Sequence, residues 1–278
     1  LTVSSATTDI GTGTYTVMVQ IAAEAVGVKH DDVTFVLGDS SLPTAPLQGG
    51  SFTVSSVGTA VQQACQALRA KLLDAVRMTH PQFAVVDMED IAFGDGYLII
   101  QDQRFAYGDI VRESSHDVLE VQIDAEPDEK RNAYATATHS AVFVEVFVDE
   151  DLGSIRVNRV VSAVAAGRVV NPKTAGSQIL GGVVWGISQA MQEETQTDHN
   201  LGRFMNHSLA EYHIPVNADI GDIDVLFVEE NDEIVNELGS KGVGEIGIVG
   251  VASAIANAIY HATGKRVREF PITLDKVL

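Results

Sequence analysis

The sequence predicts an α+β fold with two related lobes of mixed β-sheet, each with packed helices. Ala141–Val148 alternates in the manner of a half-buried strand, with Val142, Val144 and Val146 on one face. Ile246–Ala262 is a long apolar, alanine-rich run, as expected of a buried helix. Strand-like and helix-like patterns of this kind recur along the whole chain, so neither an all-α nor an all-β fold is expected.

Composition and periodicity also suggest where the lobes meet. We expect a first lobe over residues 1–112 and a second over residues 132–278. Residues 113–131 are acidic, contain one proline and show little periodicity, so we interpret them as a connection. The chain starts at Leu1 without an initiator Met, which suggests that it was cut from a longer protein or from a processed precursor.

The charge balance and the cysteine count exclude several classes of function. A formal net charge of −20 argues against nucleic acid and anionic membrane surfaces as partners, since too few basic residues are present to neutralise phosphates. The chain has one cysteine, so it forms no intramolecular disulfide and cannot supply the roughly four thiolates of an iron–sulfur cluster. We expect no apolar stretch with the charge-free length needed to span a bilayer.

A first glycine-rich loop lies near the start of the chain. Leu1–Ser5 predicts a strand, Gly11-Thr12-Gly13 a loop, and Tyr15–Ala25 an amphipathic helix. Strand, glycine loop and helix in this order are typical of phosphate cradles. The third glycine of a dinucleotide-binding fingerprint is replaced by Thr16, so a Rossmann match is weak. Both a tight turn and a phosphate or cofactor contact remain open at this loop.

A second glycine-rich loop follows the predicted strand Val33–Leu37. Gly49-Gly50-Ser51 precedes a predicted helix over Ser56–Arg77, and Thr53 and Ser55 add hydroxyl groups beside it. Phosphate oxygens accept hydrogen bonds from hydroxyl and backbone N–H groups in such loops. The same residues would also serve as an N-cap cluster, so the pattern alone does not decide.

Further elements follow the same scheme. A hairpin is expected over residues 91–100 around Gly94-Asp95-Gly96, and strands at Ile155–Ala165 and Ile223–Val228. Gln178–Gly182 is interpreted as a glycine-rich loop before a helix over Gly182–Glu194. Several helix N-termini would then be able to converge on one anionic ligand.

The stretch Asn236–Glu245 carries three glycines and one acid at the entrance to the apolar run. Desolvation would raise the pKa of Glu245, while the helix dipole would favour the ionised carboxylate. A helix-capping loop with an acid in its first turn explains the same pattern without any chemistry. The histidines give no metal site, since His207 and His213 are six apart and no His-Glu-x-x-His is present.

Taken in order, these motifs resemble the molybdenum-cofactor-binding large subunit of the xanthine dehydrogenase and aldehyde oxidoreductase family, in its C-terminal portion. The resemblance covers essentially the whole chain. The matching segments are DIGTGTYTVMVQ (9–20), GGSFTVSSVGTAVQQACQ (49–66), GRVVNP (167–172), QILGG (178–182), NHSLAEYHIP (206–215) and KGVGEIGIVG (241–250).

The resemblance implies roles for particular residues. Glu245 would be the general base in the oxidation of an aldehyde or an N-heterocycle by hydroxide transfer from molybdenum. The residues implied to contact the molybdopterin are Gly11, Thr12, Gly13, Gly49, Gly50, Ser51, Thr53, Gln178 and Gly244. The cofactor itself ligates the metal in this family, so no protein metal ligand is expected.

The chain departs from the family pattern at three places. Thr12 stands where many relatives have glutamine, Gly49-Gly50 replaces small residues such as alanine, and Ile246-Gly247 replaces a frequent Pro-Pro. These departures suit the bacterial branch that oxidises aldehydes or N-heterocycles, whose cofactor is often the cytosine dinucleotide form of molybdopterin. The compartment stays open between cytoplasm and periplasm.

The resemblance also implies partners. These are the N-terminal remainder of the same subunit, an iron–sulfur subunit, a FAD subunit as a further candidate, and a small aldehyde or heteroaromatic substrate. Because the remainder would hold other cofactor loops and most of the substrate pocket, we expect the 278-residue chain alone to bind no cofactor and to be inactive.

Two other functions compete with this interpretation. A non-catalytic binding or scaffold module would retain the fold, and substitution of Glu245 by glutamine would then leave activity unchanged. A nicotinamide-dependent dehydrogenase built on the Gly11 loop is disfavoured by the missing third glycine. It predicts binding of the nicotinamide nucleotide in a titration.

Overall fold

The computed structural model describes residues 1–114, 117–127 and 129–278. The chain divides into two compact units. Unit 1 comprises Leu1–Thr136 and Asp232–Lys241, and unit 2 comprises Ala137–Asn231 and Gly242–Leu278. The segment Asp232–Lys241 therefore belongs to unit 1 although its sequence neighbours on both sides lie in unit 2.

Unit 1 begins with a short parallel sheet and two helices. Strand β1 (Thr2–Ser4) pairs in parallel with β2 (Thr34–Val36), and helix α1 (Thr14–Val26) connects them. Helix α2 (Thr59–Thr79) follows a π-helical turn at Val54–Gly58. These elements confirm the predicted strands and helices to within a few residues.

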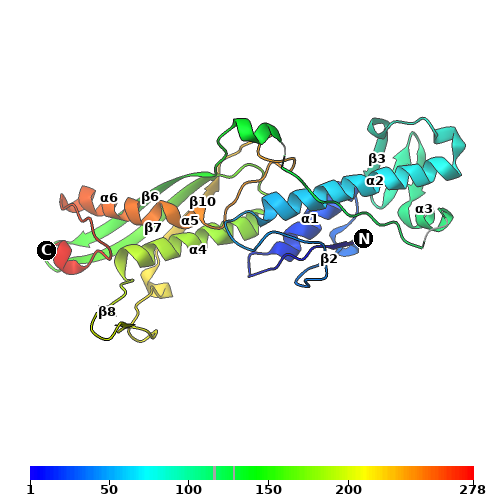
Figure 1. Ribbon diagram of the computed structural model, residues 1–278. Coiled ribbons are helices and arrows are strands. Elements are labelled where there is room, and N and C mark those ends of the chain that lie inside the picture. Colours follow the sequence, from blue (N-terminus) through cyan, green and yellow to red (C-terminus); the bar gives the residue numbers. More distant parts are fainter. Residues whose placement is uncertain (115–116, 128) are drawn as a thin grey trace. The chain divides into compact units, whose positions relative to one another are not determined.

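A β-meander completes unit 1. Strands β3 (Ile91–Gly94), β4 (Tyr97–Ile100) and β5 (Gln103–Ala106) are antiparallel and lead into helix α3 (Tyr107–Glu113). The meander packs on the C-terminal half of α2 around a core that includes Leu72, Leu73, Leu98 and Ile100 (Figure 1). The predicted hairpin at residues 91–100 is thus confirmed.

Unit 2 contains a mixed sheet with the strand order β10-β7-β6. Strands β6 (His139–Asp149) and β7 (Ser154–Ala165) form a long antiparallel hairpin, and β10 (Asp222–Phe227) lies parallel to β7. A short hairpin, in which β8 (Thr197–Asp198) and β9 (Arg203–Phe204) have two residues each, is not part of this sheet. The sheet agrees with the predicted mixed arrangement.

Three helices pack along one face of the unit 2 sheet: α4 (Pro172–Met191), α5 (Ile246–Val249) and α6 (Val251–Thr263) (Figure 1). The inward residues of β7 and the helices form a continuous apolar core. As predicted, Val142, Val144 and Val146 pack against this core from one face of β6. Its fully buried side chains include Val160, Val164, Ile179, Val183, Ile255 and Ile259.

Two expectations about these helices were wrong in detail. Helix α4 begins at Pro172 instead of near Gly182, because the Asn171 side chain accepts hydrogen bonds from the backbone N–H groups of Lys173 and Thr174 and caps the helix. Gln178–Gly182 therefore lies inside a helix and is not a loop. The apolar run after Glu245 is divided at Gly250 into α5 and α6.

The expectation that no stretch could span a bilayer was also wrong by length and composition. Ile246–Thr263 is long and apolar enough to cross a bilayer. Val251, Ala252, Ile255 and Ile259 of this stretch are buried in the core of unit 2. The packing is that of a core helix laid on a sheet.

Candidate functional site

The Gly11 loop is organised by a carboxylate from within the loop. Gly11 and Gly13 both have the left-handed backbone conformation, with φ of 100° and 88°. Asp9 accepts hydrogen bonds from the backbone N–H groups of Gly11 (2.8 Å), Gly13 (3.4 Å) and Tyr15 (3.3 Å). Asp9 thus acts as an anion at the N-terminus of α1, the position at which an external anion had been considered.

The charge on Asp9 is stabilised by this arrangement. Partial burial raises the pKa of Asp9, but hydrogen bonds from the loop amides outweigh it and lower the pKa below its usual value of 3.8. Because Asp9 already engages the amides, a ligand at this loop would meet hydroxyl groups. The Oγ1 atoms of Thr12 and Thr14 lie 3.3 Å apart beside it.

The Gly49 loop shows a second run of unusual backbone conformation. Gly50 has φ of 62° and Ser51 has φ of 59°, a left-handed conformation that is uncommon for a non-glycine residue. The π-helical turn Val54–Gly58 follows directly. Left-handed residues and π-helical turns are both enriched at functional sites, which supports this loop as part of one.

Gln48 joins the two glycine loops, and sequence reasoning missed it. Its Oε1 atom accepts a hydrogen bond from Thr53 Oγ1 at 3.0 Å and a weaker one from Thr7 Oγ1 at 3.5 Å. Thr7 lies two residues before Asp9, so the two loops meet within unit 1. No local pattern marks a glutamine for this role, since it depends on Thr7, which lies 41 positions away.

Glu245 is held by close contact between glycine backbones in unit 2. It occupies the N-cap position of α5, is exposed, and makes no side-chain hydrogen bond to the helix end. Two residues on, a Cβ atom at Gly247 would lie 2.9 Å from the carbonyl oxygen of Ile179 in α4. A Cβ atom at Gly182 would lie 2.7 Å from the carbonyl carbon of Gly247.

This contact brings two of the predicted site residues onto adjoining elements. Gln178 precedes Ile179 in α4, and Glu245 starts the short helix that rests on Ile179. Gly244 is exposed immediately before Glu245. The predicted residues Gln178, Gly244 and Glu245 thus lie together in unit 2, whereas those of the Gly11 and Gly49 loops lie together in unit 1.

A buried ion pair closes the segment that leads to Glu245. Lys241 Nζ lies 2.9 Å from Asp232 Oδ2, with side-chain exposures of 8% and 17%. The hydrogen bond from Lys241 lowers the pKa of Asp232, against the effect of burial, and the backbone N–H groups of Ile234 and Val235 lower it further. This pair was not predicted, because acids and bases nine residues apart carry no local signal.

Among the described residues, no group of three or more histidine, cysteine, aspartate or glutamate side chains is placed to hold a metal ion. Burial raises the pKa of the Cys65 thiol to about 11, so the thiolate that a metal requires is disfavoured.

Comparison with known proteins identifies the family. Residues 1–221 match the model of the molybdopterin cofactor-binding domain. The chain is 41% identical over its full length to the aldehyde oxidoreductase molybdenum-binding subunit PaoC of Escherichia coli K12, and spans 36% of that protein. It is 29% identical to the putative xanthine dehydrogenase molybdenum-binding subunit XdhA of the same strain, covering 98% of this chain and again 36% of the relative.

Solved structures agree at the level of the fold. Quinoline 2-oxidoreductase from Pseudomonas putida 86 superposes with a TM-score of 0.86 at 22% identity, over 99% of this chain and 36% of that one. A Cu,Mo-CO dehydrogenase superposes with a TM-score of 0.85 at 20% identity, over 98% of this chain and 35% of that one. The chain therefore belongs to the molybdopterin cofactor-binding domain family, and it spans about a third of the length of the relatives that it matches.

Proposed function

We propose that the chain forms part of a molybdenum hydroxylase subunit that oxidises an aldehyde or an N-heterocycle, with Glu245 as general base. The observation that carries the proposal is the position of Glu245 at the start of α5, whose backbone is locked onto α4 next to Gln178. The close contact between α4 and α5 fixes the backbone that carries the base, which favours the precise placement that proton transfer requires.

The residues present fit a molybdopterin. No described cluster supplies metal ligands, which agrees with a cofactor that carries its own. Gly50 and Ser51 hold their backbone in a left-handed conformation, and the N–H groups of such a loop suit phosphate oxygens. The Gly11 loop fits less simply, because Asp9 occupies its amides, and we assign its cofactor contact to Thr12.

When bound, the cofactor supplies the oxygen that is transferred and accepts two electrons. Glu245 accepts the proton that is released as the new carbon–oxygen bond forms. Gln178 orients the cofactor by amide hydrogen bonds, and the Gly49–Thr53 loop holds its phosphate end. We further propose the cytosine dinucleotide form, which identification of the nucleotide released from the purified protein will test.

The test is Glu245→Gln in the full-length, molybdenum-loaded subunit. Glutamine keeps the shape of the side chain but cannot accept the proton, so kcat should fall by roughly 10³-fold while the molybdenum content stays unchanged. Glu237→Gln is the matched control. Glu237 lies eight residues earlier in the same segment, is exposed, and accepts a hydrogen bond from Gln63 in unit 1.

Two results would oppose the proposal. Full activity of Glu245→Gln would favour the alternative of a non-catalytic scaffold module. An equal loss in both variants would mean that the segment acts through its fold and not through the carboxylate of Glu245.

The activity and partners of the longer protein follow as proposals. We propose that residues 1–278 assemble with the remainder of the subunit, with an iron–sulfur subunit that removes electrons, and with a FAD subunit. The chain alone should then bind no cofactor and turn over no substrate. Stoichiometric molybdenum in the purified 278-residue chain, measured by elemental analysis, would contradict this.

A further inference from the structure

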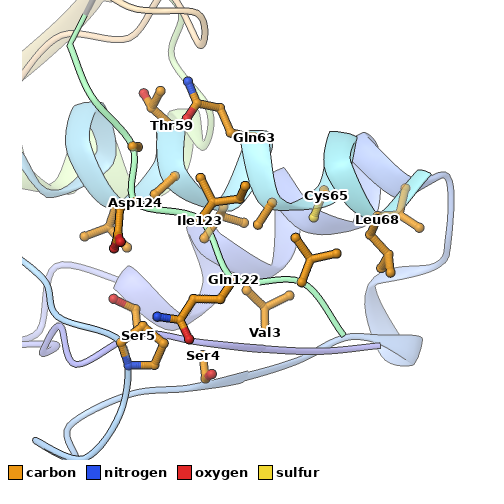
Figure 2. A pocket seen from close by; sticks show the side chains of 18 of the residues that line it. Val3, Ser4, Ser5, Thr59, Gln63, Cys65, Leu68, Gln122, Ile123 and Asp124 are labelled. Atoms are coloured by element: carbon orange, nitrogen blue, oxygen red, sulfur yellow. The ribbon is translucent and has the colours of Figure 1, made fainter. Parts of the chain in front are cut away.

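Unit 1 contains a cavity of about 1500 Å³, and none of the predicted site residues is among those that line it. Strand β1 forms one wall, the face of α2 a second, and the extended segment 117–127 a third. Figure 2 shows the backbone around Gln122, Ile123 and Asp124 running between α2 and β1. The cavity is thus bounded by two extended stretches of chain.

Strand β1 lines this cavity and, in the part of the chain that the structure describes, is paired on one edge only. Its pairing with β2 uses the odd-numbered residues, since Leu1 O accepts from Thr34 N–H and Ser5 N–H donates to Val36 O. Backbone groups alternate in direction along a strand, so those of Thr2 and Ser4 face away from β2. Among the described residues, they have no hydrogen-bond partner.

The extended segment 117–127 alternates in burial like a strand, but it is not part of a sheet. Along segment 117–127 the residues Leu119, Val121, Ile123 and Ala125 are half-buried, while the residues between them are exposed. The segment is tied to α2 by a hydrogen bond of 2.6 Å from Lys71 Nζ to the Glu120 carbonyl oxygen. An apolar alternation of this kind is typical of a chain that packs beside a sheet.

The charges around the cavity favour a polypeptide over a small anion. Arg131 is the one cationic side chain among the lining residues that the structure describes. Six acids line the same cavity: Asp32, Asp117, Glu120, Asp124, Glu126 and Glu237. A phosphate or nucleotide would be repelled, whereas an apolar strand with basic flanking residues would complement both the apolar walls and the acidic rim.

We propose that a β-strand from the remainder of the longer subunit enters this cavity and pairs with the free edge of β1. It extends the β1–β2 sheet, which has two strands of three residues and is marginal by itself. The inference shares one assumption with the proposed function, namely that the functional unit is a longer subunit. It makes no use of cofactor binding or of Glu245.

Hydrogen exchange at single amides tests the proposal. The N–H groups of Thr2 and Ser4 should exchange at least about 100-fold more slowly in the full-length gene product than in residues 1–278 alone. Val3 is the internal control, because its backbone faces β2 in both proteins. Its exchange should change much less.

The single thiol of the chain gives an independent measure of occupancy. Cys65 lines the cavity from α2 and has a relative exposure of 2%. Its reaction with a small uncharged thiol reagent should be at least about tenfold slower in the full-length protein, since an inserted strand closes the remaining access.

Several results would overturn the proposal. Equal exchange of Thr2 and Ser4 in both proteins would show that no strand pairs with β1. Concentration-dependent protection in residues 1–278 alone would assign the edge to a second copy of the chain. A defect of Glu245→Gln in turnover leaves the amide exchange unaffected, so failure of the strand proposal and failure of the proposed function are separable.

Discussion

Substitution of Gly182 by alanine tests the contact that positions Glu245. A Cβ atom there would lie 2.7 Å from the carbonyl carbon of Gly247, 2.8 Å from its Cα and 2.9 Å from the backbone nitrogen of Ile248. All three atoms belong to the backbone of α5, so a side-chain rotation cannot relieve the overlap. Either α5 moves away from α4 or the helices store strain.

The neighbouring residue Gly181 supplies the matched control, and comparison of the two variants gives the expected difference in free energy. At Gly181 a Cβ atom meets nothing within 4 Å. Gly181→Ala should therefore stabilise the helix by about 0.8–1 kcal/mol through helix propensity alone. Gly182→Ala gains the same propensity but incurs an overpacking cost of about 1–3 kcal/mol. The free energies of unfolding of the two variants should thus differ by about 1–3 kcal/mol.

Urea unfolding of the two variants, followed by far-UV circular dichroism, measures this difference. The fluorescence of Trp185, which lies in α4 and is the one tryptophan of the chain, assigns the transition to unit 2. If both variants stabilise the protein equally, α4 and α5 are not in the backbone contact described, and the positioning of Glu245 by α4 must be abandoned.

Three further predictions concern the charged groups. Lys241→Met should destabilise unit 1 by about 3 kcal/mol in urea unfolding, because it leaves the largely buried Asp232 without its cation. The double variant Lys241→Met with Asp232→Asn should recover part of this loss, because it removes the unpaired charge as well. The pKa of Asp232 is lowered in the folded state, so its contribution to the free energy of unfolding is complete above the unfolded pKa of 3.8 and is lost as the pH falls below that value. Asp232→Asn should therefore reduce the loss of stability at acid pH, measured by thermal melts at a series of pH values. Asp9→Ala should cost about 1 kcal/mol and speed amide exchange at Gly11, and Asp9→Asn, which retains one acceptor oxygen, should cost less; equal exchange in all three proteins would remove Asp9 from its capping role.

Local patterns predicted the elements that carry a strong periodicity. The alternation over Ala141–Val148 corresponds to β6, and the apolar run after Glu245 corresponds to α5 and α6. In both, the buried face repeats at the spacing of the element itself, so the sequence alone contains the information.

The glycines misled the prediction of α4. Gly181 and Gly182 suggested a loop over Gln178–Gly182, although Asn171 and Pro172 form a good helix start. Gly182 is in the helix because α5 approaches its backbone, a tertiary cause that no window of sequence reveals. The Gln48 bridge, the Lys241–Asp232 ion pair and the membership of residues 232–241 in unit 1 depend on tertiary contacts in the same way.

The central proposal is that Glu245 lies beside the molybdopterin and acts as the general base. A crystal structure of the full-length, molybdenum-loaded subunit tests it most directly. We expect the carboxylate of Glu245 within hydrogen-bond reach of the metal centre, and Gly11–Gly13 and Gly49–Thr53 in contact with the same cofactor. A cofactor bound by the unit 1 loops while Glu245 lies on a different surface of the protein would contradict the account.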